Sequence, residues 1–565
     1  MNEAYMINRA NVQSAQADYS AILDETKDPG EVSRQLLMRI LSENSGTEYG
    51  RRYDFAGIRS YGEYRSRVPV ITYDDIAGDV ERMIAGEKNI LTSYACDHMN
   101  MTSGTVGRSK RIPMTDRQAQ IFLKYNKHYM DAFYAAFLGE DWMDGKLFCT
   151  AQGRHTRNES GITIGDASSK MAEYVQGGRD GLDAILRKVY TSPVEATIPL
   201  PGTDARYIHS RFALAERDVT GVVSGFFTMV VQYFHYIGEN YDMLIRDIET
   251  GTIDPSIEMP DEVRASLLKK LSPMPERARE LREVFKNGSD FRFVPAIWPK
   301  LRFISGVGGD GFTPFANTLR RYYVGDSVRF VLSGITSSEG LWSIPVEPDS
   351  EDSVLAPGSA FMEFLPVECG DDFSKCVTID QLEVGRTYEL IVTSVTGLYR
   401  YRMSDAVMVT GFFNNTPRVR FMYRVNKTVN LAAEKTTEKA LQTAAEAAAD
   451  ELGFPLSDFT VYPDAQSIPA RYVFLIQPHL PVTSVTPEQL ADSVDRHLRE
   501  ANNSYARLAD DGRLQKAEAF FLQPETTFLW RDLEIAKGKS PNQLKPLRVI
   551  QTEQQKKFFY ILREM

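Results

Sequence analysis

The spacing of apolar residues along the chain predicts helices and strands in alternation. Apolar residues recur at helical intervals from Val32 to Leu41, which predicts a helix over Glu31–Ser42. Farther on, short apolar runs that predict strands alternate with helical patterns and with turns rich in glycine and proline. Four such runs are Lys146–Thr150, Phe303–Ser305, Val328–Leu332 and Tyr388–Thr393. Strands interleaved with helices are typical of an α/β fold.

The pattern restarts as a smaller unit near the end of the chain. After the strand-like run Arg418–Met422 we expect a boundary at Tyr423–Lys427. Two helices, the second opening with a capping box and running towards Leu508, then alternate with short strands; these segments are Thr437–Leu452, Phe459–Tyr462, Tyr472–Gln477, Thr486–Gln489 and Ala519–Leu522. We therefore predict an N-terminal domain, residues 1–424, with mixed sheets and helices, and a small α/β C-terminal domain, residues 425–565.

One long segment carries no charge. No residue between Asp218 and Glu239 is charged, and Val222–Ile237 is largely apolar. This stretch is about long enough to cross a bilayer, but it contains polar side chains such as Gln232 and His235, and no second such segment follows. We therefore predict a fully buried helix and no insertion into a membrane.

Composition and charge exclude several classes of protein. The formal net charge is −11, with acidic and basic residues mixed along the chain, which argues against nucleic acid as the main partner. The four cysteines are spaced for neither a zinc site nor a disulfide framework. The first residues contain no apolar signal core. These features together favour a cytoplasmic protein.

Three short blocks carry the candidate chemistry, and the first is a loop rich in glycine and hydroxyl groups. It runs Met-Thr-Ser-Gly-Thr-Val-Gly-Arg-Ser-Lys, from Met101 to Lys110. Gly104 and Gly107 allow the backbone to approach a ligand closely, and the hydroxyls, backbone N–H groups and cations suit an anion such as phosphate. The loop lacks the Walker A pattern. An ordinary turn between strands is the alternative.

The second block is Ile-Thr-Ser-Ser-Glu-Gly, from Ile335 to Gly340, and it follows the apolar run Val328–Leu332. A carboxylate beyond the end of a strand lies where α/β sheets bind ligands. Mg2+ prefers such oxygen ligands together with phosphate oxygens. Glu339 is therefore a candidate metal ligand, and the alternative is a surface turn in which Glu339 is simply solvated.

The third block is Tyr-Arg-Tyr-Arg-Met-Ser-Asp, from Tyr399 to Asp405. Because an ionised Asp only accepts hydrogen bonds, Asp405 could accept both hydroxyl groups of a ribose. Arg400 and Arg402 could hold phosphate or pair locally with acids; the alternative is a strand pair with alternating exposed cations. Together the three blocks provide what the activation of a carboxylic acid by ATP needs, which is a phosphate cradle, a Mg2+ ligand and a ribose clamp.

Other motifs add little to this chemistry. The seven histidines form no metal-binding pattern, so we expect each to be structural or at the surface. No Gly-x-Ser-x-Gly elbow is present, which argues against a hydrolase. The glycine cluster Gly306–Gly311 follows a predicted strand, but it is not a dinucleotide-binding fingerprint.

The blocks and their order resemble those of the auxin-responsive (Gretchen Hagen-type) acyl acid–amido synthetases, a branch of the acyl-adenylate-forming superfamily. The resemblance covers nearly the whole chain. Besides the three blocks it includes Gly161–Ser168, Tyr190–Glu195, Glu434–Glu438 and Asn542–Lys545. We expect a bacterial-type member of this family. Two positions depart from the family pattern: Ser404 stands where a glycine is usual, and Pro546 lies one place earlier than the proline of the family's Lys-x-Pro-Arg.

The resemblance implies an adenylate-forming N-terminal domain and a mobile C-terminal domain that closes over the nucleotide. ATP and Mg2+ would convert a small carboxylic acid to an acyl-AMP, and the amine of an amino acid would then displace AMP to form an amide. The implied nucleotide-binding residues are Thr102, Ser103, Gly104, Thr105, Ser338, Tyr401, Asp405 and Arg424. Glu339, as Mg2+ ligand, and Lys545, reaching the phosphates from the C-terminal domain, are the implied catalytic residues. An acyl-CoA ligase and a nucleotide-binding protein without turnover remain as alternatives, and the oligomeric state stays open.

Overall fold

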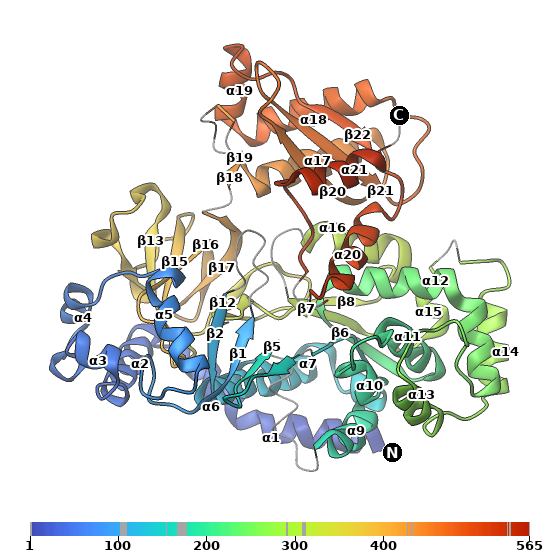
Figure 1. Cartoon of the computed structure of the whole chain (residues 1–565), viewed down its shortest axis with the longest axis horizontal. Coiled ribbons are helices and arrows are strands. Elements are labelled where there is room, and N and C mark those ends of the chain that lie inside the picture. The colour runs from blue at the N-terminus through green and yellow to red at the C-terminus, as the bar shows by residue number, and fades with distance from the viewer. Residues whose placement is uncertain are drawn as a thin grey trace. The chain divides into compact units, whose positions relative to one another are not determined.

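The computed structural model describes residues 3–101, 110–153, 155–165, 178–289, 292–307, 312–425, 428–429, 431–432, 434, 436–539, 541 and 544–563. The chain forms two compact units with mixed helices and sheets (Figure 1). The N-terminal unit contains Met1–Gly308 and Tyr322–Phe421, and the C-terminal unit contains Gly309–Arg321 and Met422–Met565. The mixed α/β fold with a large N-terminal part agrees with the prediction. The domain bounds 1–424 and 425–565 stay a prediction, which did not include Gly309–Arg321 in the smaller part.

A parallel four-stranded sheet lies in the N-terminal unit, in the order β3-β6-β7-β8. Its strands are β3 Lys146–Cys149, β6 Val219–Phe226, β7 Phe303–Val307 and β8 Arg329–Leu332. Three of these strands were predicted from apolar runs. The helices of this part of the chain are α9 Gly178–Val189, α10 Val194–Thr197, α11 Ala205–Ala215, α12 Phe227–Thr250, α13 Asp261–Leu268, α14 Pro275–Val284 and α15 Val294–Ile297. Buried side chains of α12 and β7 belong to the core of this unit.

The prediction of one buried helix over Val222–Ile237 is wrong. The first part of this stretch is the central strand β6, and the helix α12 begins only at Phe227. A strand that is buried on both faces forms a continuous apolar run, which periodicity alone does not distinguish from a buried helix. None of the helices in the described part of the chain combines the length and apolar content that a membrane span requires.

The second large sheet of the N-terminal unit has seven strands in the order β11-β12-β17-β16-β15-β13-β14. These strands are β11 Ser343–Pro345, β12 Ser353–Leu355, β13 Phe361–Pro366, β14 Val377–Thr378, β15 Thr387–Thr393, β16 Tyr401–Phe413 and β17 Thr416–Arg424. Two further strand groups lie nearby in sequence, a four-stranded sheet of β1 Cys96–Met101, β2 Arg111–Thr115, β4 His155–Arg157 and β5 Thr163–Gly165, and the pair β9 Thr336–Ser337 and β10 Gly340–Leu341.

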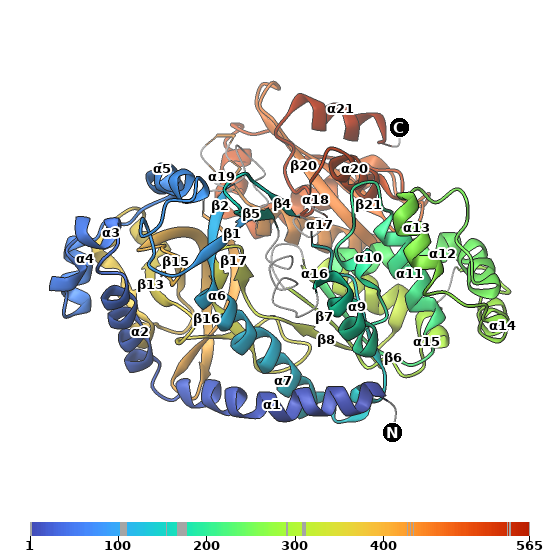
Figure 2. The same cartoon turned by 60° about the horizontal axis from the view of Figure 1, so that its bottom comes forward.

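Helices from the start of the chain complete the N-terminal unit. They are α1 Glu3–Glu25, α2 Pro29–Glu43, α3 Glu48–Arg52, α4 Tyr61–Arg67, α5 Tyr73–Ile84, α6 Asp116–Phe122 and α7 Tyr129–Leu138. The predicted helix at Glu31–Ser42 corresponds to α2, whose apolar side packs with α5 into the core of the seven-stranded sheet. The helix α1 packs along α7 (Figure 2).

The C-terminal unit is built around the sheet β20-β21-β22. Its elements are α16 Phe312–Thr318, β18 Thr428–Val429, β19 Thr436–Thr437, α17 Glu438–Leu452, β20 Leu456–Asp464, β21 Arg471–Pro478, α18 Pro487–Ala501, α19 Asn503–Asp510, β22 Glu518–Phe521, α20 Thr526–Ala536 and α21 Glu553–Ile561. The predicted helix running towards Leu508 is in fact two helices. Asn502 leaves the helical conformation and accepts N–H bonds from Ser504 and Tyr505, so it caps the second helix.

Candidate active site

The glycine-rich block connects two neighbouring strands. The predicted phosphate-binding residues Thr102, Ser103, Gly104 and Thr105 lie outside the described residues. On either side of them, β1 ends at Met101 and β2 begins at Arg111, and these two residues face each other in an antiparallel pair. The block therefore joins the ends of a strand pair, which is compatible with both a ligand-binding loop and an ordinary turn.

The second block is bound directly to the strand that enters this loop. Ser338 and Glu339 form the turn between β9 and β10. The side-chain amide of Asn100, in β1, donates to the Ser338 carbonyl oxygen at 2.9 Å. In the opposite direction, the Ser338 hydroxyl donates to the carbonyl oxygen of Met101 at 3.2 Å. Two blocks that are more than two hundred residues apart in sequence are therefore held together by reciprocal hydrogen bonds.

Glu339 is a buried carboxylate in this turn, with 9% of its surface exposed. Its backbone N–H donates to the Ser337 hydroxyl at 3.2 Å. Within the described part of the chain, no side chain forms a hydrogen bond or ion pair with the Glu339 carboxylate. A buried carboxylate is normally paired or coordinates a metal, so the residue fits a divalent cation such as Mg2+. Its burial argues against the alternative of a simply solvated surface turn.

The third block meets the other end of the glycine-rich loop. Tyr401, which is fully buried in β16, accepts a hydrogen bond on its hydroxyl from the Lys110 ammonium at 3.1 Å. The same ammonium lies 5.7 Å from the centre of the Tyr401 ring and 5.9 Å from that of the Tyr73 ring. Both described ends of the loop are thus bound to residues of the other two blocks.

The two arginines of the third block pair with acids of two strands in the seven-stranded sheet. Arg400 forms a buried ion pair with Glu363 of β13, with Nε 2.9 Å from Oε2. Burial disfavours the charged guanidinium, but the attraction and hydrogen bonds of Glu363 outweigh it and raise the pKa of Arg400. Arg402 pairs with Glu389 of β15 at 2.6 Å. Local pairing is therefore what the structure shows, and the alternative of alternating exposed cations is wrong.

Asp405 lies in a distorted part of β16. It is buried, and the preceding Ser404 has a φ of 62°. The pairing of β15 with β16 shifts register between Glu389 and Ile391, opposite this point. A left-handed residue at such an irregularity is where glycine is favoured, so Ser404 adopts the backbone conformation that suits the glycine expected there.

The remaining predicted residues belong to the C-terminal unit. Arg424 ends β17, and Lys545 precedes a segment that pairs with β20. Three residues after Lys545, the buried Arg548 forms an ion pair with Asp458 and donates to the Phe459 carbonyl oxygen at 2.8 Å. Arg548 therefore anchors the end of the Lys545 segment to β20 of the same unit.

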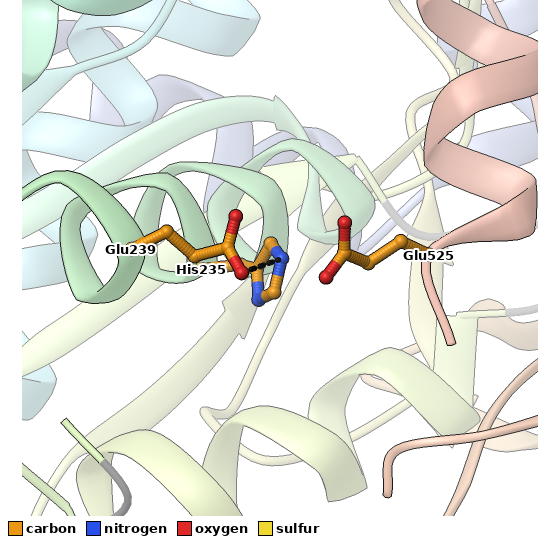
Figure 3. A group of neighbouring side chains, drawn as sticks. All are labelled: His235, Glu239 and Glu525. Carbon is orange, nitrogen blue, oxygen red and sulfur yellow. Dashed lines mark ion pairs between the residues drawn. The ribbon is translucent and has the colours of Figure 1, made fainter. Parts of the chain in front are cut away.

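One histidine lies beside a carboxylate on the same helix. His235 and Glu239 are one turn apart on α12, with Nε2 3.6 Å from Oε1 (Figure 3). Glu525, drawn in the same picture, belongs to the C-terminal unit. We therefore interpret the pair on α12 by itself, as an interaction within the helix.

Sequence reasoning missed Asn100 and the acids Glu363 and Glu389. Asn100 directly precedes the glycine-rich block, and its side-chain amide contacts the Glu339 turn. An Arg-x-Arg alternation signals that acids are needed nearby, but it does not say which acids. The ion pairs in the folded structure identify them.

Comparisons with known proteins find one family whose models match most of the chain. The sequence matches the GH3 family N-terminal domain over residues 18–328, the GH3 family central domain over 353–424 and the GH3 family C-terminal domain over 438–554. It is 27% identical over 552 residues to the probable indole-3-acetic acid-amido synthetase GH3.1 of Arabidopsis thaliana, covering 94% of this chain and 90% of that one. It is 26% identical to the jasmonoyl–L-amino acid synthetase JAR6 of Nicotiana attenuata, covering 85% and 84%.

A solved structure also shares the fold. The GH3.15 acyl acid amido synthetase superimposes with a TM-score of 0.83 at 22% identity, covering 97% of this chain and 96% of that one. The relatives named above are plant enzymes, so they lend no support to the expectation of a bacterial-type member. The matches to all three domains, over most of the chain, show that this protein belongs to the GH3 family.

Proposed function

We propose that this protein is an ATP-dependent acyl acid–amido synthetase, an AMP-forming ligase. The observation that carries the proposal is the convergence of three sequence blocks around the ends of one loop, in a member of the GH3 family. The relatives are named as amido synthetases for indole-3-acetic acid and as synthetases of jasmonoyl amino acids. The same reaction class, with a small carboxylic acid and an amino acid as substrates, is the function that fits this chain.

The nucleotide would bind at the glycine-rich loop, with Ser103 and Thr105 at the phosphates beside Thr102 and Gly104. Asp405 would accept hydrogen bonds from the ribose hydroxyls. Glu339 would hold Mg2+, whose role would be to neutralise charge on the phosphates as the carboxylate of the substrate attacks. Its buried carboxylate, with no cationic partner in the described chain, supports this assignment.

Further residues of the blocks would support the nucleotide less directly. Ser338 would hold the turn that carries Glu339, and Tyr401 would act through its bond to Lys110. Arg424 is proposed as a further nucleotide contact, next to the predicted domain boundary.

The C-terminal domain would supply Lys545 to the phosphates. We propose that residues 425–565 form a mobile domain that closes over the nucleotide after it binds. The anchoring of the segment by Arg548 supports a fixed position of Lys545 within its own unit. Closure would then bring the lysine to the site as part of a rigid body.

The reaction would proceed in two displacements. In the first, an oxygen of the carboxylic acid bonds to the α-phosphorus of ATP and pyrophosphate leaves. In the second, the nitrogen of the amino acid bonds to the acyl carbon, AMP leaves and the amine loses a proton.

We place this activity in the cytoplasm, because the four cysteines are free thiols, as a reducing compartment maintains them.

Product analysis by mass spectrometry tests the proposal. The protein is incubated with ATP, Mg2+, pooled carboxylic acids, pooled amino acids and CoA, and the Glu339→Gln variant serves as the control. AMP together with a new amide, formed by the wild type and much reduced in the variant, is the expected result. An acyl-CoA in place of an amide would show an acyl-CoA ligase. ATP binding without AMP for any acid would show a nucleotide-binding protein without turnover.

A further inference from the structure

Asn100 joins the strand that enters the glycine-rich loop to the turn that carries Glu339. The residue is 1% exposed and lies on β1, which pairs with β2 and β5. The side-chain N–H2 group donates to the Ser338 carbonyl oxygen at 2.9 Å and lies 3.7 Å from the sulfur of Met114. The strong partner of this amide is therefore the backbone of the turn.

The amide is costly to bury, which suggests that its donor is needed. Among the described residues, no group donates a hydrogen bond to the Asn100 side-chain oxygen, although this oxygen is buried. A buried polar atom without a partner is unfavourable, and an apolar residue of similar size would avoid it. The hydrogen bond to Ser338 is the contribution that an apolar residue could not make.

The position of Glu339 depends on this turn. Its carboxylate is not held by any side chain in the described parts of the protein, as shown above. Ser338 fixes the turn through its hydroxyl, which donates to Met101, and through its carbonyl oxygen, which accepts from Asn100. Loss of the Asn100 donor would remove the hydrogen bond to this partly buried carbonyl oxygen and would release one of these two restraints.

We propose that Asn100 is a positioning residue that holds Glu339 in place for Mg2+. The proposal rests on the proposed function, since it requires Glu339 to be the metal ligand. Outer partners that orient a metal ligand typically change metal affinity by 10–100-fold when they are mutated. We expect an effect of that size from Asn100, transmitted through Ser338.

Binding of Mn2+ tests the proposal without turnover. Free Mn2+ is measured by electron paramagnetic resonance while the protein is titrated in the presence of an ATP analogue that is not cleaved between the α- and β-phosphates. Asn100→Ala is expected to weaken Mn2+ binding about 10–100-fold. Asn100→Asp keeps the size but loses the donor, and it is expected to behave in the same way if the alanine variant does not fold.

The chain offers a matched control in Asn8. Its amide is also buried and donates to two backbone carbonyl oxygens, those of Met143 and Gly145, at 3.1 and 3.3 Å. Asn8→Ala therefore removes the same kind of interaction from α1. It is expected to lower the unfolding midpoint while leaving Mn2+ binding within about twofold of the wild type, because no described contact connects it to Glu339.

A double-mutant cycle with Glu339 separates the proposal from the proposed function. If Asn100 acts through Glu339, Asn100→Ala adds nothing to the loss of Mn2+ binding already caused by Glu339→Gln. A further loss in the double variant, or an Asn100→Ala variant that binds Mn2+ as tightly as Asn8→Ala, would overturn the role of Asn100 alone. Unchanged Mn2+ binding in Glu339→Gln would overturn the metal assignment of the proposed function and this inference with it.

Discussion

The buried ion pair between Arg400 and Glu363 is expected to stabilise the fold and to take no part in binding phosphate. Glu363 is 1% exposed in its side chain, and the side chain of Arg400 is 4% exposed. The guanidinium also donates to the carbonyl oxygens of Val68, at 2.9 Å, and Arg65, at 3.1 Å. Both Nη groups and Nε are thus committed to groups inside the N-terminal unit.

The expected loss of folding stability follows from the buried groups that each substitution leaves without a partner. In Arg400→Met, the Glu363 carboxylate stays buried, and among the described residues the Tyr61 hydroxyl, at 2.9 Å, is the side-chain donor left to it. Removing one member of a buried pair typically costs about 3–5 kcal/mol. In Arg400→Met/Glu363→Leu neither charge of this pair remains, although two carbonyl oxygens lose their donor. We expect the double variant to regain about 2 kcal/mol or more relative to Arg400→Met.

Two assays on the same proteins test this reasoning. Urea unfolding gives the stabilities, and ATP–pyrophosphate exchange with a substrate acid gives the use of ATP. We expect the double variant to keep the wild-type KM for ATP within about threefold, which is less than 1 kcal/mol. If it folds but uses ATP at least a hundredfold less well, Arg400 contacts the nucleotide and the structural role is refuted. A loss below about 1 kcal/mol in Arg400→Met would refute the stabilising role.

Three further outcomes are expected. Ser404→Val should be less stable than Ser404→Gly by about 2 kcal/mol, because a β-branched residue does not tolerate a φ of 62°; equal urea midpoints would contradict this. Burial lowers the pKa of His209 to about 3 in the folded protein. Between this value and the pKa of roughly 6.5 in the unfolded chain, only the unfolded chain binds the proton. The free energy of unfolding should therefore fall by about 1 kcal/mol per pH unit as the pH drops below roughly 6.5. His209→Gln should remove this part of the pH slope in urea midpoints measured from pH 7.5 to 5. Asp458→Ala should destabilise the C-terminal unit by about 3 kcal/mol by leaving Arg548 unpaired, whereas Lys545→Ala should change the midpoint by less than about 1 kcal/mol; similar losses would show that the ion pair is not the anchor.

The sequence predicted most of the helices and strands, because the spacing of apolar residues and the caps that indicate them lie within each element. The apolar spacing that indicated α2 depends on one face of one helix, and the capping box at Thr486–Gln489 gives the start of α18 by itself. The prediction failed at β6 because a strand in the middle of a parallel sheet is apolar on both faces. The β-branched residues and glycines of Val219–Phe226 were the available signal for a strand. The length of the uncharged apolar stretch led instead to the prediction of a helix.

The candidate site was predictable in its blocks but not in its connections. A hydroxyl-rich loop, an acid after a strand and an Arg-x-Arg alternation can each be read from adjacent residues. The partners of these groups depend on which strands lie side by side, and that is decided by the packing of the whole unit. For this reason Glu363 could not be chosen from the many acids of the chain, and Asn100 carried no signal of its own.

These contacts also explain how site residues that are about three hundred positions apart in sequence can be held at defined positions. Asn100 meets Ser338 across 238 residues, and Lys110 meets Tyr401 across 291 residues. Each of these contacts joins residues at or next to strand ends. The strands and turn involved are β1 and β2 of one four-stranded sheet, the β9–β10 turn, and β16 of the seven-stranded sheet. The backbone of a strand is held in place along its length by hydrogen bonds to the neighbouring strands. The described ends of the glycine-rich loop are therefore fixed by the fold. Two of the side chains in the proposed chemistry, Glu339 and Asp405, likewise lie in a strand turn and a strand that the sheets hold in place.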